Sequence, residues 1–311
     1  MRPSRIAGVC GFAAIALVAT PNAGTGQWAS DPWLEQAVDA TTFESWLPFF
    51  SYDEQLSFEL DVREATDSEG IRIERLAFTS TPGERVYADH YTVPMAPRSR
   101  PYLVMLHGGT ESGRQSMRRP AEFLVRRGFR VIAIDLPYFG ERDTGLLGSF
   151  SESDKHEALY NAESAYLQWV IQVVKDVGRT IDLIIERYDA DPDRLGLVGY
   201  SRGAQAGFIV LAVEQRLRAG ALLYGGHFDR GETGHLAAAC PANYIGHIAP
   251  RPLWLLNGIF DGDYDREKSV EPLIRRAGEP KVVNWVPTGH QRPREEDLEK
   301  MADWLRTTFQ E

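Results

Sequence analysis

The chain has 311 residues and a net charge of −10, from 34 basic and 44 acidic side chains. An acidic surface repels nucleic acid and anionic membranes, so both are excluded as partners. Of the two cysteines, Cys10 and Cys240, the first lies in a segment that we expect to be removed. No intramolecular disulfide can then form, and burial of the remaining thiol is favoured over a bridge between two chains.

Residues 1–23 are typical of a secretory signal peptide. Arg2 and Arg5 form a short basic region, and the apolar run that follows is too short to span a bilayer comfortably. Cleavage is predicted after Ala19 or Ala23, and the alternative is an uncleaved N-terminal anchor. Because this leader carries two arginines and no acids, its removal changes the net charge from −10 to −12. We therefore predict a secreted or periplasmic protein without stable membrane association.

The rest of the chain predicts one main domain with an N-terminal extension. Residues 24–69, rich in tryptophan and phenylalanine over their first half, are interpreted as a helical extension that packs on the main domain, 70–311. The strand-like runs 71–79 and 85–93 flank a turn that contains Pro82 and Gly83, and they predict an antiparallel hairpin.

From residue 101 onward, strands and helices alternate, which requires a mostly parallel sheet with helices on both faces. We expect Gly178 to break or bend the longest helix. The strands are predicted at 101–106, 129–135, 195–198, 219–224, 252–256 and 281–286, and the helices at 117–127, 155–187, 204–208, 270–276 and 294–309.

The most informative stretch is Gly199-Tyr200-Ser201-Arg202-Gly203, which follows an apolar strand and precedes a helix of small residues. Glycine on both sides lets the chain bend sharply there. Such a turn exposes the serine hydroxyl at the carboxyl end of the sheet, above a helix N-terminus. A nucleophile needs that placement, so Ser201 is the candidate nucleophile; the alternative is an ordinary strand-to-helix turn.

A serine hydroxyl needs a base to act as a nucleophile, and the base needs an orienting carboxylate. His290 follows the last predicted strand, and Asp261 follows the strand before it. Because parallel strands share one carboxyl edge, we expect both side chains near Ser201. Asp261 is the preferred acid. The weaker candidates are, in order, Asp263 and then Asp265 and Asp229.

A third element follows the first parallel strand, where the turn His107-Gly108-Gly109 lets backbone N–H groups approach a substrate oxygen closely. The expected oxyanion donors are the N–H of Arg202 and that of Gly109 or Thr110. The alternative is a tight turn without this role. We expect His107 itself to be structural.

Other signals are weaker. Tyr138 and Phe139 follow a strand and are expected to line the substrate pocket, with a structural role as the alternative. The stretch 142–156 is rich in glycine and serine and has the composition of a lid or of a passive surface loop. Four residues close together in the sequence suggest a metal site, and Cys240 and His247 lie nearby. Their spacing matches no known set of metal ligands, so we predict no metal and no cofactor. Those four are His227, Asp229, Glu232 and His235.

Taken together, these motifs resemble the α/β-hydrolase superfamily, and within it the branch of bacterial dienelactone hydrolases and acetyl xylan esterases. The resemblance covers roughly residues 70–310 and rests on the His107 turn, the stretch from Asp135 to Arg142, the segment from Asp191 to Gly203, and the Asp261 and His290 loops. The Pro82–Tyr87 stretch also resembles the entry hairpin of that branch.

The resemblance implies an α/β-hydrolase fold and a catalytic triad of Ser201, Asp261 and His290 that acts on small-molecule or carbohydrate esters. Dienelactone hydrolases proper use a cysteine nucleophile, so the serine here favours ordinary carboxylic esters. The alternatives are a serine peptidase of the prolyl-oligopeptidase type, a lyase or transferase on the same scaffold, and an inactive hydrolase that serves as a binding protein. The oligomeric state is not predicted.

Overall fold

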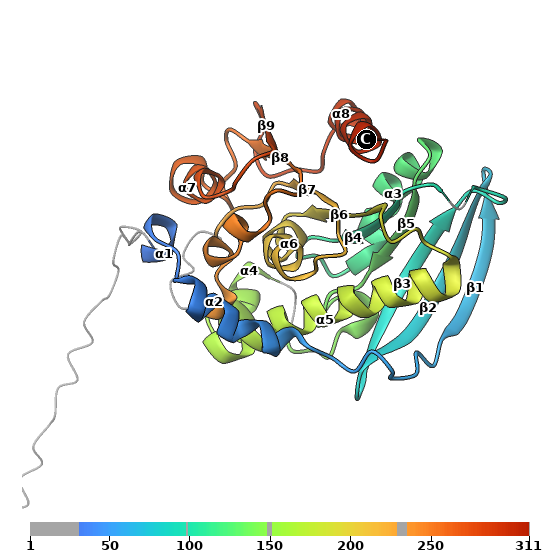
Figure 1. Ribbon diagram of the computed structural model, residues 1–311, viewed down its shortest axis with the longest axis horizontal. Helices are drawn as coiled ribbons and strands as arrows, with labels where there is room; N and C mark the ends of the chain where they lie inside the picture. The colour runs from blue at the N-terminus through green and yellow to red at the C-terminus, as the bar shows by residue number, and fades with distance from the viewer. Residues whose placement is uncertain (1–30, 98, 148–150, 229–234, 311) are drawn as a thin grey trace, which may run out of the picture.

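The computed structural model describes residues 31–97, 99–147, 151–228 and 235–310, so the predicted signal peptide lies outside the described residues. These residues form a nine-stranded sheet in the order β1-β2-β3-β5-β4-β6-β7-β8-β9 (Figure 1). The strands are β1 (Asp61–Ser68), β2 (Ile71–Thr81), β3 (Glu84–Thr92), β4 (Tyr102–Leu106), β5 (Arg130–Ile134), β6 (Leu195–Tyr200), β7 (Ala219–Leu223), β8 (Leu253–Gly258) and β9 (Lys281–Val286).

The sheet has the predicted class. Strands β4 to β9 are parallel to one another, whereas β1, β2 and β3 form an antiparallel meander that joins the sheet through β5. Every residue of β4, β5 and β7 is buried. Apolar strands of this kind require cover on both faces, which explains why their sequences read as continuous apolar runs.

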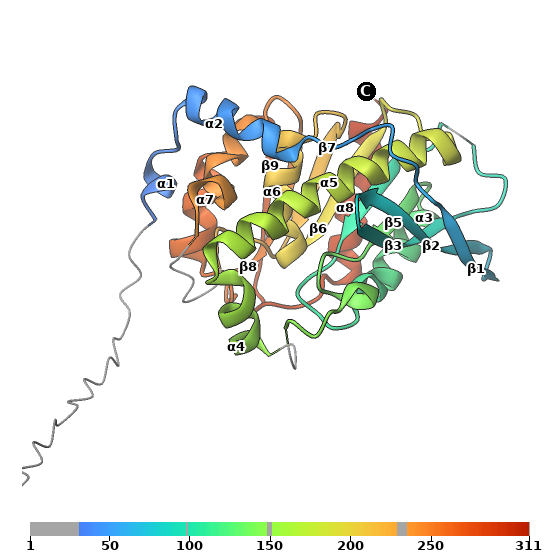
Figure 2. The same cartoon turned by 90° about the horizontal axis from the view of Figure 1, so that it is seen from below.

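Helices supply that cover. Apolar residues of α3 and α8 pack on one face of the sheet, and those of α5, α6 and α7 pack on the other, as Figure 2 shows. None of the helices in the described ranges is both long and apolar enough to cross a membrane. The α-helices are α1 (Pro32–Glu35), α2 (Ala40–Trp46), α3 (Arg118–Arg126), α4 (Glu152–Lys155), α5 (Glu163–Tyr188), α6 (Arg202–Val213), α7 (Glu271–Arg275) and α8 (Glu295–Thr308).

The N-terminal extension differs from the prediction of a purely helical segment. It contains α1, α2 and a 3₁₀ turn at Leu47–Phe50, but it ends in β1, which pairs with β2. All of β1 is exposed and most of its side chains are polar, so no apolar alternation marks it as a strand. The expected aromatic packing is present, because Phe43 and Phe50 both contact the ring of Tyr244 edge-on.

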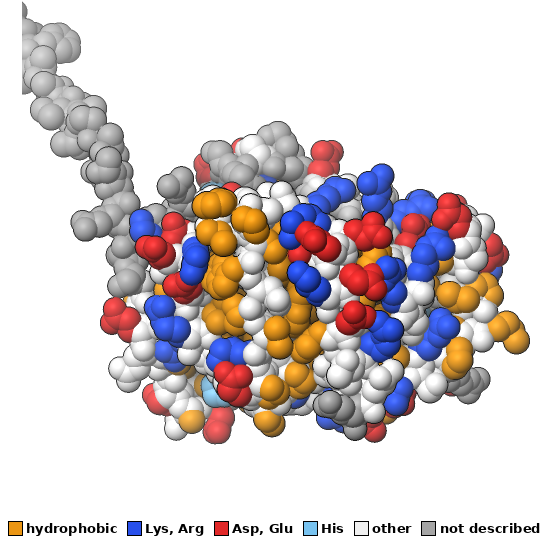
Figure 3. Space-filling model, turned by 90° about the horizontal axis from the view of Figure 1, so that it is seen from above, with side chains coloured by type: hydrophobic (Ala, Val, Ile, Leu, Met, Phe, Trp, Pro, Cys, Tyr) orange, Lys and Arg blue, Asp and Glu red, His pale blue; other side chains and the backbone are white. Residues whose placement is uncertain are grey.

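The two edges of the sheet differ in polarity. At the edge opposite β1, strand β9 exposes Val282 and Val283 by 40% and 36%. Figure 3 shows apolar side chains gathered in a band on one face of the molecule, flanked by charged side chains. The polar β1 edge is therefore the better protected against pairing with another strand.

The predicted break at Gly178 is absent, because α5 continues from Glu163 to Tyr188 through this residue. A Cβ at this position would lie 2.5 Å from the ring of Tyr52. The glycine is therefore required for the close approach of the N-terminal extension to α5 rather than for a bend.

A second glycine fixes how α6 meets the sheet. A Cβ on Gly203 would lie 2.4 Å from the carbonyl oxygen of Leu106, at the end of β4. Since that atom is backbone, it cannot move aside without displacing the strand. We expect Gly203→Ala to lower the free energy of unfolding by about 1 to 3 kcal/mol.

Urea unfolding of the purified variant measures this loss. Gly246→Ala is the matched control, because Gly246 is exposed and its Cβ would meet only one atom, at 3.4 Å. Equal stability of the two variants would contradict the proposed packing.

Candidate active site

Ser201 lies at the junction of β6 and α6 in a strained backbone conformation, with φ 52° and ψ −117°. Such positive φ values are rare for residues other than glycine and cost about 1 to 3 kcal/mol. One hydrogen bond and one close backbone approach hold the turn in place. The N–H of Ser201 donates to the carbonyl oxygen of Leu223 on β7 at 2.8 Å, and a Cβ on Gly199 would lie 2.6 Å from the carbonyl oxygen of Gly203.

The three predicted triad residues meet in one hydrogen-bonded chain. The Oγ of Ser201 is 2.8 Å from Nε2 of His290, and Nδ1 of the same imidazole is 2.9 Å from Oδ2 of Asp261. If Nδ1 carries the proton and donates to the carboxylate, Nε2 accepts from the serine hydroxyl. This is the relation between nucleophile, base and orienting acid that acyl transfer requires.

The geometry separates the competing acids. The Asp261 side chain is fully buried, and its Oδ1 accepts from the backbone N–H groups of Asp263 and Tyr264 at 2.9 and 3.0 Å. Asp263 is 58% exposed, and its carboxylate lies 3.8 Å from the wrong nitrogen, Nε2 of His290. Asp265 caps the helical turn at Arg266–Val270, and Asp229 lies outside the described residues.

Three tyrosine rings surround the imidazole of His290. The ring centroids of Tyr200, Tyr224 and Tyr264 lie 5.8, 6.0 and 5.7 Å from it. The imidazole is therefore held by packing as well as by its two hydrogen bonds. Its side chain remains 18% exposed, which leaves one side open to the cavity described below.

The predicted oxyanion turn packs directly against Ser201. A Cβ on Gly108 would lie 3.1 Å from the Cβ of Ser201. The N–H of Thr110 donates back to the carbonyl oxygen of Gly108 at 2.8 Å. Of the two N–H groups left open by the sequence, that of Gly109 is therefore the better candidate donor, since it has no hydrogen-bond partner among the described residues.

His107 braces this turn and has no contact with the triad. Its Nδ1 donates to the carbonyl oxygen of Gly108 at 2.6 Å, and its Nε2 accepts from the N–H of Leu136 at 3.0 Å. Burial lowers the pKa of His107, in keeping with the neutral tautomer that these two bonds define. This is the structural role expected for it.

Arg114 is a supporting residue that sequence reasoning missed. It is buried and pairs with Asp89 at 2.9 Å, and also with Asp135 and Glu141. Asp135 accepts in addition from the backbone N–H groups of Arg114 and Glu141, at 2.7 and 2.9 Å. The ion-pair cluster thus ties the segment after β4 to the segment after β5.

Tyr138 and Phe139 do not fulfil the expectation that they line the pocket. Neither is among the residues around the cavity at Ser201. Phe139 is fully buried, and its ring packs edge-on against His107 at 5.6 Å. Its contribution is to the support of the oxyanion turn.

Lys155 and Tyr160 line the cavity at Ser201 where Tyr138 and Phe139 were expected. Lys155 lies within the predicted lid, 142–156, and Tyr160 follows it; residues 148–150 of that stretch lie outside the described ranges. Nζ of Lys155 donates to the carbonyl oxygen of Gly109 at 3.1 Å. The guanidinium of Arg202 stacks on the ring of Tyr160, with 3.6 Å between Cζ and the centroid. Both residues line the cavity.

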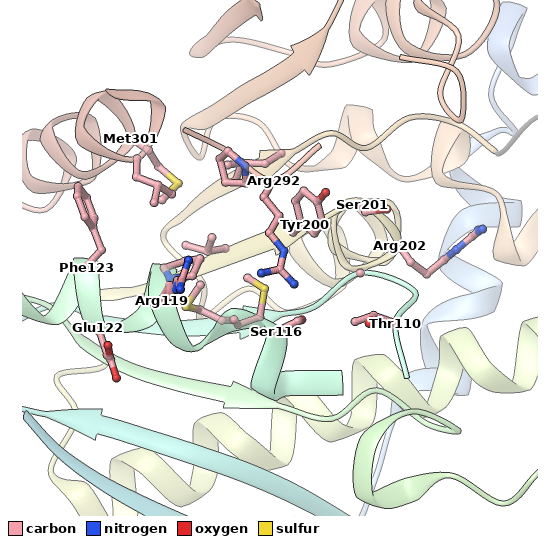
Figure 4. A pocket seen from close by; sticks show the side chains of 18 of the residues that line it. Thr110, Ser116, Arg119, Glu122, Phe123, Tyr200, Ser201, Arg202, Arg292 and Met301 are labelled. Atoms are coloured by element: carbon pink, nitrogen blue, oxygen red, sulfur yellow. The ribbon is translucent and has the colours of Figure 1, made fainter. Parts of the chain in front are cut away.

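The cavity has a volume of about 810 Å³ and extends from Ser201 between α3 and α8. Figure 4 shows Arg119 and Arg292 directed into it, with Phe123 and Met301 at its far end. Acidic side chains, Asp263 among them, also line the cavity, so its charge is mixed. A space of this size and lining accommodates a polar organic molecule of moderate size.

The residues considered for a metal lie elsewhere. His227, His235 and Cys240 come together, and the fourth member of the group is Asp31, from the N-terminal extension. The other two candidates, Asp229 and Glu232, lie outside the described residues. None of the four clustered residues lines the cavity at Ser201.

A model of the alpha/beta hydrolase family matches residues 103–307. The chain therefore belongs to the alpha/beta hydrolase family. No match was found among curated proteins.

Several solved structures share the fold. Acetyl xylan esterase 1 from Thermoanaerobacterium sp. JW/SL YS485 is 16% identical, with a TM-score of 0.67 over 88% of this chain and 97% of that one. Acetyl xylan esterase from Paenibacillus sp. R4 is 15% identical, with a TM-score of 0.62 over 88% and 98%. A cold-adapted esterase from an Arctic intertidal metagenomic library is 18% identical, with a TM-score of 0.61 over 81% and 99%.

The hydrogen-bonded chain predicts a serine that reacts with a fluorophosphonate. We expect labelling at Ser201, and we expect Asp261→Asn to slow it by roughly three to four orders of magnitude, because the imidazole loses its orienting carboxylate. Intact-protein and peptide mass spectrometry measure the rate and the site of labelling.

Asp263→Asn is the matched control and should change the labelling rate by less than about tenfold, since its carboxylate is exposed and screened. Equal losses in the two variants, or label on another residue, would contradict this assignment.

Proposed function

We propose that the protein is a secreted serine hydrolase that cleaves carboxylic esters through an acyl-enzyme. The observation that carries the proposal is the continuous chain from Ser201 through His290 to the buried carboxylate of Asp261. The adjoining cavity gives a substrate access to Ser201.

In the first half of the reaction, Oγ of Ser201 attacks the ester carbonyl while Nε2 of His290 takes its proton. The negative oxygen of the tetrahedral intermediate accepts hydrogen bonds from the N–H groups of Arg202 and Gly109. His290 then gives the proton to the leaving alcohol, and the acyl group stays on the serine. Asp261 stabilises the imidazolium that forms in between.

In the second half, water takes the place of the alcohol. His290 removes a proton from the water as it attacks the acyl carbonyl, and the same two N–H groups hold the second intermediate. Return of the proton to Ser201 releases the acid and restores the enzyme. Every step uses side chains and amides of this chain, so the proposed reaction needs no cofactor.

For the substrate, we propose esters with a small acyl group and a polar alcohol, such as acetyl esters of carbohydrates. The mixed charge and the volume of the cavity suit a sugar better than a long lipid chain. Two solved structures that share the fold are acetyl xylan esterases by title.

Export belongs to this proposal and rests on the sequence of residues 1–23 alone. Its direct check is the N-terminal residue of the protein recovered outside the cytoplasm, expected within or just after that segment.

The esterase reaction is tested with p-nitrophenyl acetate and with acetylated xylo-oligosaccharides. We expect turnover of both by the wild-type protein and loss of at least about three orders of magnitude in Ser201→Ala, which lacks the nucleophile. Equal rates in the wild type and the variant would contradict the esterase proposal and favour the binding-protein alternative. Turnover of the phenyl ester alone would retain the esterase and remove the carbohydrate.

Lys155 provides a second prediction, because its buried ammonium group holds the carbonyl of Gly109 and so restrains the residue that carries the proposed oxyanion donor. We expect Lys155→Met to lower kcat roughly tenfold with little change in KM, as expected when an interaction acts mainly in the transition state. Lys155→Arg should restore part of the loss. Steady-state kinetics measure both parameters.

Lys300→Met is the control for the loss of a lysine, since Lys300 is exposed on α8. A rise in KM without a fall in kcat for Lys155→Met would show that the lysine serves substrate binding instead.

A further inference from the structure

A second group of chemically reactive side chains lies apart from the cavity. Asp31 is at the start of the N-terminal extension, His227 follows β7, and His235 and Cys240 lie further along the same connection to β8. One donor atom from each of the four lies within 4.8 Å of the others. Asp31 is 10% exposed, His227 8% and His235 6%. Cys240 is fully buried, at 0%.

The two carboxylate oxygens of Asp31 have different partners. Its Oδ1 caps α1 by accepting from the N–H of Trp33 at 2.9 Å. Its Oδ2 is 2.8 Å from Nε2 of His227 and 2.7 Å from Nε2 of His235. The thiol of Cys240 completes the group, with its Sγ 3.9 Å from the same oxygen and 3.8 Å from Nδ1 of His227.

Hydrogen bonding alone does not account for this group. Although Nε2 of His235 lies 2.7 Å from a carboxylate oxygen of Asp31, neither of its buried ring nitrogens has a hydrogen-bond partner among the described residues. An imidazole nitrogen that is buried and unpartnered is costly. The nitrogen gains a partner if a cation lies between it and the carboxylate oxygen, because the lone pairs of both atoms then bind the cation.

The spacing of the donor atoms is close to that of a four-coordinate ion. Around tetrahedral zinc, nitrogen and oxygen ligands lie ~3.3 Å from one another and ~3.6 Å from a sulfur ligand. Here Sγ of Cys240 lies 3.9 Å from the carboxylate oxygen of Asp31, and one donor atom from each of the four residues lies within 4.8 Å of the others. The two contacts of the carboxylate oxygen are about half an ångström shorter than the zinc values, and a small outward movement of Asp31 corrects both.

The surroundings also suit a metal. Phe228 stacks on His235 with 3.8 Å between ring centroids, and Trp33 packs edge-on against it at 5.3 Å. These rings exclude water from one side of the group and fix the orientation of the imidazole, as the apolar surroundings of metal sites do.

We propose that Asp31, His227, His235 and Cys240 form a structural zinc site. One carboxylate oxygen, two imidazole nitrogens and a thiolate are ligands that zinc accepts in tetrahedral sites, and four protein ligands leave no position open for catalysis. The site joins residues 196 positions apart in the chain, Asp31 and His227, and so fastens the N-terminal extension to the connection between β7 and β8. The metal would cross-link two distant segments of the chain, as a disulfide does in many exported proteins.

The decisive measurement is metal binding by the purified full-length chain after treatment with a chelator. We expect one equivalent of Zn²⁺ with a dissociation constant below about 0.1 μM, and a rise in Tm of roughly 5 to 10 °C when free Zn²⁺ exceeds that constant a hundredfold. Co²⁺ should bind in its place and give the intense visible bands of a tetrahedral complex, with a thiolate charge-transfer band.

Variants assign the ligands. His235→Ala should weaken Zn²⁺ binding at least about a hundredfold, and Cys240→Ser should abolish the thiolate band of the Co²⁺ complex. His247→Ala is the matched control, because this histidine lies in the same region but stacks on Phe43 instead. It should bind Zn²⁺ as the wild type does.

A second group, formed by Asp261, Asp263 and His290, also has donor atoms close together, so the titrations are repeated in a His290→Ala background. Binding that persists there, with its thiolate band, supports the proposed site. Less than half an equivalent of Zn²⁺ bound by the wild type, a Co²⁺ complex without the thiolate band, or binding that disappears with His290 would each overturn it, whether or not the variants fold.

Discussion

The strained backbone of Ser201 is the constraint on which the arrangement of the site depends. A φ of 52° is stable here only because β6 and α6 are fixed on both sides of the turn. The fixing is backbone against backbone, since the glycine at the start of α6 lies against the end of β4 with no room for a Cβ. Because β6 lies between β4 and β7 in the sheet, the same contacts place the oxyanion turn on one side of the serine, while the histidine loop approaches from beyond β7. The strain at Ser201 and the position of its side chain thus have a single cause.

The oxyanion turn depends on a buried polar framework rather than on apolar packing. Arg114, Asp89 and Asp135 are charged side chains that are buried, and Glu141 joins them from a partly exposed position. Buried charges of this kind are stable only when each remains paired. His107 adds a neutral hydrogen-bonded bridge from the turn to the segment after β5. Both devices link the ends of β4 and β5, which are neighbours in the sheet. Burying these groups costs free energy, but it makes the turn rigid. Rigidity is what the two proposed N–H donors would need, because a donor that must reorient stabilises an oxyanion poorly.

The sequence was informative wherever a feature follows from neighbouring residues. Apolar runs mark β4 to β8, and the position of a residue after a given strand places Ser201, Asp261 and His290 at one edge of a parallel sheet. It was uninformative where a feature depends on distant partners. The exposed, polar strand β1 forms only because β2 offers a free edge, and Gly178 is required by a tyrosine more than a hundred residues away. Phe139 follows a strand end as pocket residues do, yet its ring turns inward to meet His107. Asp31 could not be grouped with His235 and Cys240, because no local spacing relates them.

The N-terminal extension has the least stability of its own and therefore depends most on such distant contacts. A four-residue helix such as α1 is not stable in isolation, and its position here follows from Asp31 at one end and from Arg276, which donates to the carbonyl oxygen of Glu35 at 3.1 Å, at the other. The connection after β7 gains order from the same carboxylate. The carbonyl oxygen of His227 in this connection accepts a 2.5 Å hydrogen bond from the side chain of Gln205. The side chain of Gln205 in turn accepts from that of Arg202, which is next to Ser201. A metal bound at Asp31 would therefore stabilise the first turn of α6 as well as the extension, although it lies outside the cavity and takes no part in the proposed reaction.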